Sequence, residues 1–113
     1  MRPLIFISLL ILLSRCIPIA ADNVHEDEII QVKFTYQDDR AQKVCIAGSF
    51  NQWSPRSHCM TKKNKIWTLT LSLPPGRYPY LFLIDDRISK LDPGTPLTEE
   101  NGFGTRNSVL VVE

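Results

Sequence analysis

The sequence predicts an all-β fold, a small antiparallel β-sandwich that follows an N-terminal signal peptide. Apolar side chains alternate with polar ones along several short segments, which is the pattern of half-buried strands. Gly, Pro, Asn and Asp separate these segments, with a turn about every 8 to 12 residues. None of the segments has the 3.6-residue apolar period of an amphipathic helix. Short strands at this spacing are typical of a sandwich around one hydrophobic core.

The N-terminal residues have the three parts of a secretory signal peptide. Arg2 gives a positive start, residues 4–13 are apolar except for one serine, and residues 19–21 (IAA) offer small side chains for cleavage. The apolar segment is shorter than the ~20 residues that a membrane-spanning helix needs. We therefore expect a signal peptide over residues 1–21, cleavage after Ala21, and export to the periplasm or to the outside of the cell.

Two alternatives for the N-terminus remain open. The segment can stay uncleaved as a membrane anchor, or Cys16 can carry a lipid, although Arg15 stands where lipoprotein signals have a small residue. Only in these two cases do we expect contact with a membrane. Removal of the peptide leaves a polar lead-in over residues 22–29 and one domain over residues 30–113.

The charge of the exported chain excludes one class of partner. The full sequence has 13 basic and 12 acidic residues, so loss of Arg2 and Arg15 leaves 11 basic residues and a net charge of −1. A near-neutral domain lacks the basic surface of proteins that bind nucleic acid. We therefore expect no nucleic-acid partner.

Alternation defines the strands expected in the first half of the domain. Residues 32–36 (VKFTY) alternate apolar and polar side chains, and residues 44–47 (VCIA) lead into a turn at Gly48-Ser49. The clearest strand covers residues 67–73 (WTLTLSL), in which Trp67 and three leucines share one face. We expect that face, Trp67 included, to lie in the core.

Turn residues define the second half. Pro74-Pro75-Gly76 is a strong turn signal between the strand over 67–73 and the next one. The remaining elements are a strand over 78–84, a turn at Asp85-Asp86, a short strand over 88–91, a turn at 92–94, a turn-rich loop over 95–106 and a final β-branched strand over 108–112.

Residues 22–113 contain two cysteines, Cys45 and Cys59. An even pair in an exported domain suggests a disulfide. The bond would close a loop of about 15 residues and stabilise the fold by ~3 kcal/mol. The alternative is two separate reduced thiols.

The most informative motif spans residues 48–53 (GSFNQW), where an apolar strand meets a turn and then a tryptophan. A tryptophan just past a turn is poorly placed for a core and well placed to present its ring to a ligand. Aromatic rings are large, rigid contacts that lose little entropy on binding. An exposed Trp53 ring therefore indicates a binding module, whereas the alternative is a ring that caps the edge of the sandwich.

Several motifs follow one another at familiar spacings: FTY at 34–36, VCIAGSFNQW at 44–53, Trp67, LPPGRY at 73–78, FLID at 82–85, Asp92-Pro93 and NSV at 107–109. The chain resembles the glycogen-binding domain of the AMP-activated protein kinase β-subunit. It also resembles the early-set domains of isoamylases and glycogen-branching enzymes, carbohydrate-binding module family 48. The resemblance covers about residues 30–113 and implies an immunoglobulin-like, early-set sandwich.

The resemblance implies an α-glucan site built on three residues. Trp53 matches the first of two tryptophans, Asn107 matches an asparagine of the last loop, and Phe103 falls where a leucine inserts beside the glucan. Leu81 and Ile88 stand where that family has a lysine and its second tryptophan. Because leucine cannot donate to a sugar hydroxyl, we expect weaker or differently shaped binding. In the structural alternatives, Phe103 folds back on the sheet and Asn107 bonds to the backbone.

A second hypothesis keeps the fold and assigns it a protein partner. By parity, Leu81 and Leu83 point away from the inward row of their strand, and together with Ile88 they would form an exposed apolar patch. Contiguous apolar surface with a polar rim usually marks a partner contact. The α-glucan and the protein partner are therefore both kept as hypotheses.

Catalytic and metal chemistry find few candidate residues. His25 lies in the polar lead-in, and His58 beside Cys59 lacks the further ligands that a metal site needs. Asp85-Asp86 is better explained as a solvated turn than as the paired carboxylates of a glycosidase. We therefore expect no enzyme activity, no cofactor and no metal.

Overall fold

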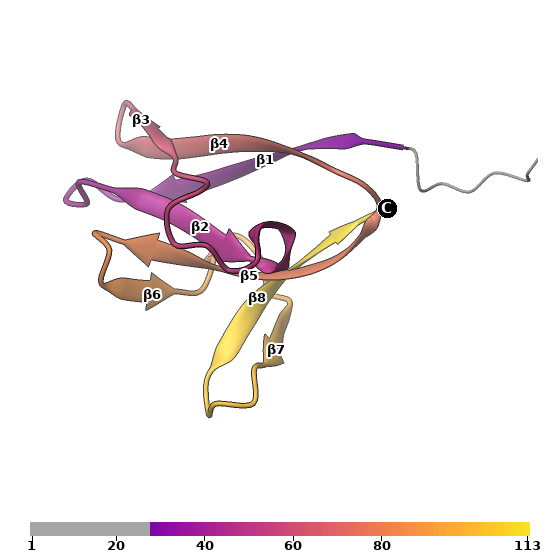
Figure 1. The fold of residues 1–113 in the computed structure, drawn as a ribbon. Coiled ribbons are helices and arrows are strands. Elements are labelled where there is room, and N and C mark those ends of the chain that lie inside the picture. The colour runs from indigo at the N-terminus through magenta and orange to yellow at the C-terminus, as the bar shows by residue number, and fades with distance from the viewer. Residues whose placement is uncertain (1–27) are drawn as a thin grey trace, which may run out of the picture.

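Two antiparallel sheets pack face to face in the computed structural model, which describes residues 28–113 (Figure 1). The expected signal peptide over 1–21, and all but the end of the lead-in over 22–29, lie outside the described residues. Within residues 28–113 the regular elements are strands and one 3₁₀ turn, and none of them is a helix long and apolar enough to cross a membrane. The predicted all-β sandwich is confirmed.

The smaller sheet has the order β1-β4-β3. It consists of β1 (Ile30–Gln37), β4 (Ile66–Leu73) and β3 (Thr61–Lys63). Tyr36 lies opposite Trp67 in this ladder. The predicted inward face of 67–73 is confirmed, because Trp67 is buried.

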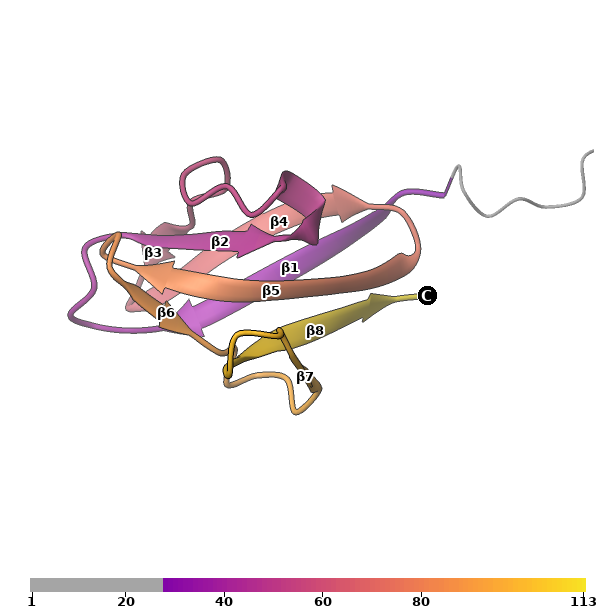
Figure 2. The same ribbon diagram turned by 60° about the horizontal axis from the view of Figure 1, so that its bottom comes forward.

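The larger sheet has the order β2-β5-β8-β7, and β6 pairs with the far end of β5 (Figure 2). Its strands are β2 (Val44–Gly48), β5 (Gly76–Ile84), β6 (Ile88–Lys90), β7 (Thr98–Glu100) and β8 (Arg106–Val112). β5 is the central strand, since it pairs with β2, β6 and β8. The site described below lies over β5 and β8.

The core fills the space between the sheets with the alternating rows that the sequence predicts. The fully buried side chains include Val44, Ile46 and Phe82. Aromatic rings meet across the two sheets: Phe34 contacts Tyr80 edge to face, with ring centroids 5.2 Å apart. Such pairs stabilise a core by about 0.5–1.5 kcal/mol beyond their buried area.

Two short strands were not expected. β3 (TKK) is exposed and β7 (TEE) is half-buried, and both consist of polar residues, so they lack the alternation that reveals a strand. β3 owes its place to a hairpin whose turn residues, Asn64 and Lys65, both have positive φ. The predicted Asp85-Asp86 turn has the same conformation, and the Asp85 carboxylate accepts hydrogen bonds from the backbone N–H groups of Gln42 and Lys43.

The predicted disulfide between Cys45 and Cys59 is present, with an S–S distance of 2.01 Å. It joins β2 to the segment over 54–60, which β2 also holds through two backbone hydrogen bonds. In these bonds the Ile46 N–H donates to the His58 carbonyl, and the Met60 N–H donates to the Val44 carbonyl. The segment is thereby fixed beside the turn that carries Trp53.

Candidate functional site

A cavity of about 440 Å³ on the outer face of the larger sheet brings the three predicted site residues together. Its lining residues are Trp53, Leu81, Asn101, Phe103 and Asn107. They come from the turn after β2, from β5, from the β7–β8 loop and from β8. The cavity therefore has two walls of different origin, the Trp53 turn and the Phe103 loop.

The Trp53 turn projects its ring away from the core. After the 3₁₀ turn Ser49–Asn51, Gln52 and Trp53 both have positive φ, 55° and 58°, a conformation uncommon for residues other than glycine. The Trp53 N–H donates to the Gly48 carbonyl at 2.9 Å and closes the turn. The Trp53 residue is 40% exposed, so a large part of its aromatic surface is available to a ligand.

Asn51, which the sequence did not single out, holds this turn from below. Its buried side chain accepts from the Gly48 N–H at 3.0 Å and donates to the Ile46 carbonyl at 2.9 Å. Its Nδ2 also lies 3.0 Å from Nδ1 of His58, the residue next to Cys59. The disulfide, His58 and Asn51 therefore form one continuous support for Trp53. The only sequence signal was an asparagine beside a turn, which often bonds to nearby backbone.

The Phe103 loop connects β7 to β8 and projects an aromatic ring into solvent. Gly102 and Gly104 flank Phe103 with φ of 83° and 82°, values that glycine adopts without steric cost. Phe103 is 89% exposed, so it does not fold back on the sheet. Asn101 opens the loop and also lines the cavity. The sequence had placed Asn101 only within a turn-rich loop.

Asn107 supplies the polar floor of the cavity. The residue is 7% exposed, and no side-chain hydrogen bond within residues 28–113 engages its amide. A primary amide offers two donors and one acceptor. No polar side-chain atom within residues 28–113 is both buried and unpaired, so this amide is accessible at the cavity surface, where it can exchange hydrogen bonds with the hydroxyl groups of a ligand.

Leu81 also lines a second hollow, of about 480 Å³. The second hollow is lined by Leu81, Ser89, Leu91, Thr105 and Arg106. The two hollows therefore share one residue of β5.

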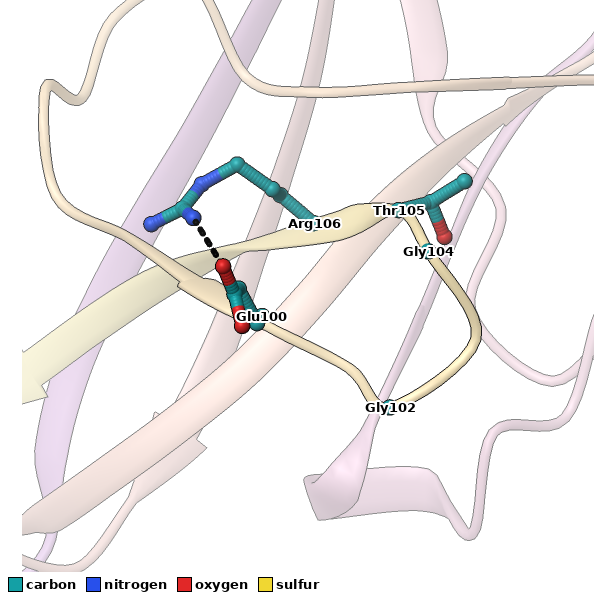
Figure 3. Close-up of a pocket in the computed structure, with 5 residues that line it drawn as sticks. All are labelled: Glu100, Gly102, Gly104, Thr105 and Arg106. Atoms are coloured by element: carbon teal, nitrogen blue, oxygen red, sulfur yellow. Dashed lines mark ion pairs between the residues drawn. The ribbon is translucent and has the colours of Figure 1, made fainter.

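A third hollow, of about 440 Å³, adjoins the second because the two share Thr105 and Arg106. Figure 3 shows Arg106 facing Glu100 across the β7–β8 hairpin, with 3.7 Å between the guanidinium and the carboxylate, whereas Thr105 points away. Arg106 also donates to the Thr98 hydroxyl and carbonyl, so its charge is engaged within the hairpin. The three hollows thus adjoin one another around the Phe103 loop.

The apolar patch expected from Leu81, Leu83 and Ile88 does not form. In the β5–β6 hairpin Ile88 lies opposite Ile84, while Ser89 lies opposite Leu83. Directly opposed residues point to the same face of a sheet, so Ile88 shares the face of the buried Ile84, and the two leucines lie on the other face. Alternation shows which side chains share a face within one strand, but not which residues of the next strand lie on that face. The sequence misplaced Ile88 because the register across the turn was unknown.

Asp92 holds the two central strands together. Its carboxylate accepts from the Tyr80 hydroxyl at 2.5 Å and from the Gly94 N–H at 2.7 Å, and its own N–H donates to the Ser108 hydroxyl at 2.8 Å. Burial, reinforced by the bond to Asp92, raises the pKa of Tyr80 well above its usual range. Among residues 28–113, no three His, Cys, Asp or Glu side chains are grouped to hold a metal ion.

Comparison with known proteins decides the family. The family model described as the glycogen recognition site of AMP-activated protein kinase matches residues 30–113. The chain belongs to this family. The glycogen-recognition domains therefore include this sandwich, as its motifs implied, and the match spans every strand described above.

Individual relatives and a solved structure support the same family. The chain is 32% identical over 72 residues to Protein PTST homolog 2 of Arabidopsis thaliana, covering 64% of this chain and 13% of that protein. It is also 32% identical over 72 residues to the AMP-activated protein kinase subunit beta-1 of Sus scrofa, covering 64% of this chain and 56% of that subunit. A crystal structure of maltogenic amylase from S. marinus superposes with a TM-score of 0.62 at 26% identity, covering 74% of this chain and 13% of that one. The match therefore covers between 13% and 56% of the length of these relatives.

Proposed function

We propose that this domain binds α-glucan chains without catalysing a reaction on them. Trp53 stacks on the apolar face of a glucose unit, Asn107 exchanges hydrogen bonds with its hydroxyls, and Phe103 makes an apolar contact beside them. The observation that carries the proposal is the meeting of an exposed Trp53 ring and an unengaged Asn107 amide in one cavity of a glycogen-recognition domain.

The chemistry of the two walls suits a sugar. A pyranose has flat C–H faces and a rim of hydroxyls, so it pairs with an aromatic ring on its face and with amide groups at its edge. Small-molecule sites typically combine apolar surface with a few placed polar groups. The cavity of about 440 Å³ has this composition, since Trp53, Leu81 and Phe103 surround two asparagines.

The residues that usually accompany the tryptophan are absent, which favours modest affinity. Leu81 takes the place of the lysine that the resemblance implies, and the outward residue of β6 is Ser89 rather than an aromatic. The aromatic residues that line the cavity are Trp53, which is partly buried, and Phe103, which is almost fully exposed. We propose that binding depends more heavily on Trp53 here than where two tryptophans share the ligand.

Export and absence of catalysis complete the proposal. The leader pattern of residues 1–21 and the Cys45–Cys59 bond both favour an oxidising, exported location. The two carboxylates of the Asp85-Asp86 turn have structural partners: Asp85 accepts from the backbone N–H groups of Gln42 and Lys43, and Asp86 forms an ion pair with Lys43 at 3.1 Å. A catalytic activity on the same polysaccharide would then belong to another domain or protein.

Affinity electrophoresis tests the function. The domain over 22–113 is run through native gels with and without glycogen or amylopectin, beside Trp53→Ala. A matched control is Ile66→Ala, which removes a comparably exposed apolar residue (43%) from the other sheet. We expect retardation of the wild type and of the control, and loss of retardation in Trp53→Ala. An unretarded wild type would refute α-glucan binding, and a retarded Trp53→Ala would refute the site.

A further inference from the structure

We infer that Asn101 is a positioning residue, whose side chain holds the Phe103 loop in the conformation that receives the ligand. The inference rests on the proposed function, because it names how one wall of the same cavity is kept in place. It departs from the residues that the family resemblance supplied, among which Asn101 was absent.

Both ends of the Asn101 side-chain amide are used inside its own loop. Oδ1 accepts a hydrogen bond from the Phe103 N–H at 3.0 Å, and Nδ2 donates to the Thr105 hydroxyl at 2.6 Å. The Asn101 backbone N–H also donates to the Thr105 carbonyl at 3.1 Å. Three hydrogen bonds from one residue therefore cross the base of the loop and reach the backbone of its aromatic tip.

The loop needs such a brace because little else fixes it. Gly102 and Gly104 have positive φ, and a Cβ atom at either would meet nothing within 4 Å. Glycine loses more conformational freedom on ordering than other residues, and Phe103 itself is 89% exposed. Without the asparagine, the loop would have to be ordered at the moment of binding, which lowers affinity.

Two explanations for an effect of Asn101 on binding can be distinguished by experiment. Asn101 lines the cavity, so a direct contact with the sugar is the competing explanation. A residue that acts only through Phe103 has no effect once Phe103 is gone. A double-mutant cycle between the two positions therefore separates the explanations.

The first experiment measures glycogen affinity by native gels over a range of glycogen concentrations. We expect Asn101→Ala to weaken binding about five- to tenfold, the cost of ordering a short loop. We expect Asn101→Asp to stay within about twofold of wild type, because the carboxylate still accepts from Phe103 N–H and the Thr105 hydroxyl can reverse its role and donate. In the Phe103→Ala background, Asn101→Ala should have no further effect.

The matched control is Gln31→Ala, which likewise removes one exposed side-chain hydrogen bond, to Ser72 on the smaller sheet. Its affinity should equal that of wild type. An equal loss of affinity on Asn101→Ala in both backgrounds would show a direct ligand contact and overturn the inference. No loss in either background would overturn it as well.

The second experiment needs no ligand. Backbone amide exchange measured by NMR should be faster at Phe103 in Asn101→Ala by about fivefold, since its N–H loses an intramolecular acceptor. Amides of β5 should be unchanged. If wild type fails to bind glycogen, the proposed function falls while this measurement still decides whether Asn101 orders the loop. Unchanged exchange at Phe103 would overturn the positioning role.

Discussion

The two walls of the cavity are built in opposite ways. The Trp53 turn rests on the core: Asn51 is 5% exposed beneath it, and His58 reaches Asn51 from a segment that the disulfide ties to β2. The Phe103 loop stands free of the core and is held by hydrogen bonds among its own residues. One wall is therefore coupled to global stability, whereas the other is ordered locally and can change without unfolding the domain.

The largest effect should follow from removing the sulfur bridge under the Trp53 wall. Replacing Cys45 and Cys59 together by Ala is expected to lower the free energy of unfolding by ~3 kcal/mol, because the loop of about 15 residues regains its freedom in the unfolded chain. Urea denaturation of the double variant beside the oxidised wild type measures the change. A loss below about 1 kcal/mol would contradict a supporting role for the bond.

A somewhat smaller effect is expected from Asn51→Ala, which leaves the Ile46 carbonyl and the Gly48 N–H without their partner. An unsatisfied buried group costs about 1–3 kcal/mol, so we expect ~2 kcal/mol of destabilisation. Glycogen affinity should fall as well, because Trp53 loses its support. Equal stability of variant and wild type in urea would break the comparison between the walls.

The strand beneath the Trp53 wall should show a pH effect. The folded state raises the pKa of Tyr80, so Tyr80 stabilises the fold below its unfolded pKa of about 10, and this contribution is lost as pH rises above that value. At neutral pH, Tyr80→Phe should cost ~1 kcal/mol by removing the bond to Asp92. Urea titrations between about pH 8 and 11 should show the gap between variant and wild type narrowing. A gap that is constant with pH would refute this assignment.

The smallest effect on stability is expected at the other wall. Phe103→Ala removes a ring that is 89% exposed, so the free energy of unfolding should change by less than about 0.5 kcal/mol. Glycogen retardation should nevertheless weaken, which separates binding from folding at this position. A stability loss comparable to that of Asn51→Ala would mean that the loop is coupled to the core after all.

Alternation and turn chemistry were sufficient for most of the fold. The inward rows that contain Phe34, Trp67 and Tyr80 are mostly buried as predicted, because period-two burial is encoded in each strand by itself. β3 and β7 were missed because strands made only of polar residues carry no such signal. Their places depend on hairpin partners rather than on their own side chains.

Only those residues of the candidate site that belong to a recognisable sequence motif were predicted. Trp53, Phe103 and Asn107 line one cavity, as the resemblance implied. Asn51 and Asn101 were missed because an asparagine in a turn is common, and its partners are known only once the backbone is placed. Ile88 was misplaced because register across a hairpin depends on turn geometry that composition does not reveal.

The packing around Gly48 means that the two walls of the cavity differ in how well they tolerate substitution. A Cβ atom there would lie 2.8 Å from the Pro79 carbonyl oxygen, from the Tyr80 Cβ and from the Phe50 ring, so the strand beneath Trp53 tolerates no side chain at this point. A variant library aimed at new sugars would therefore lose most members with changes at this position to misfolding. Diversity placed at Phe103 meets open solvent instead. The domain offers one fixed and one variable surface, and new ligand preferences are best sought on the variable one.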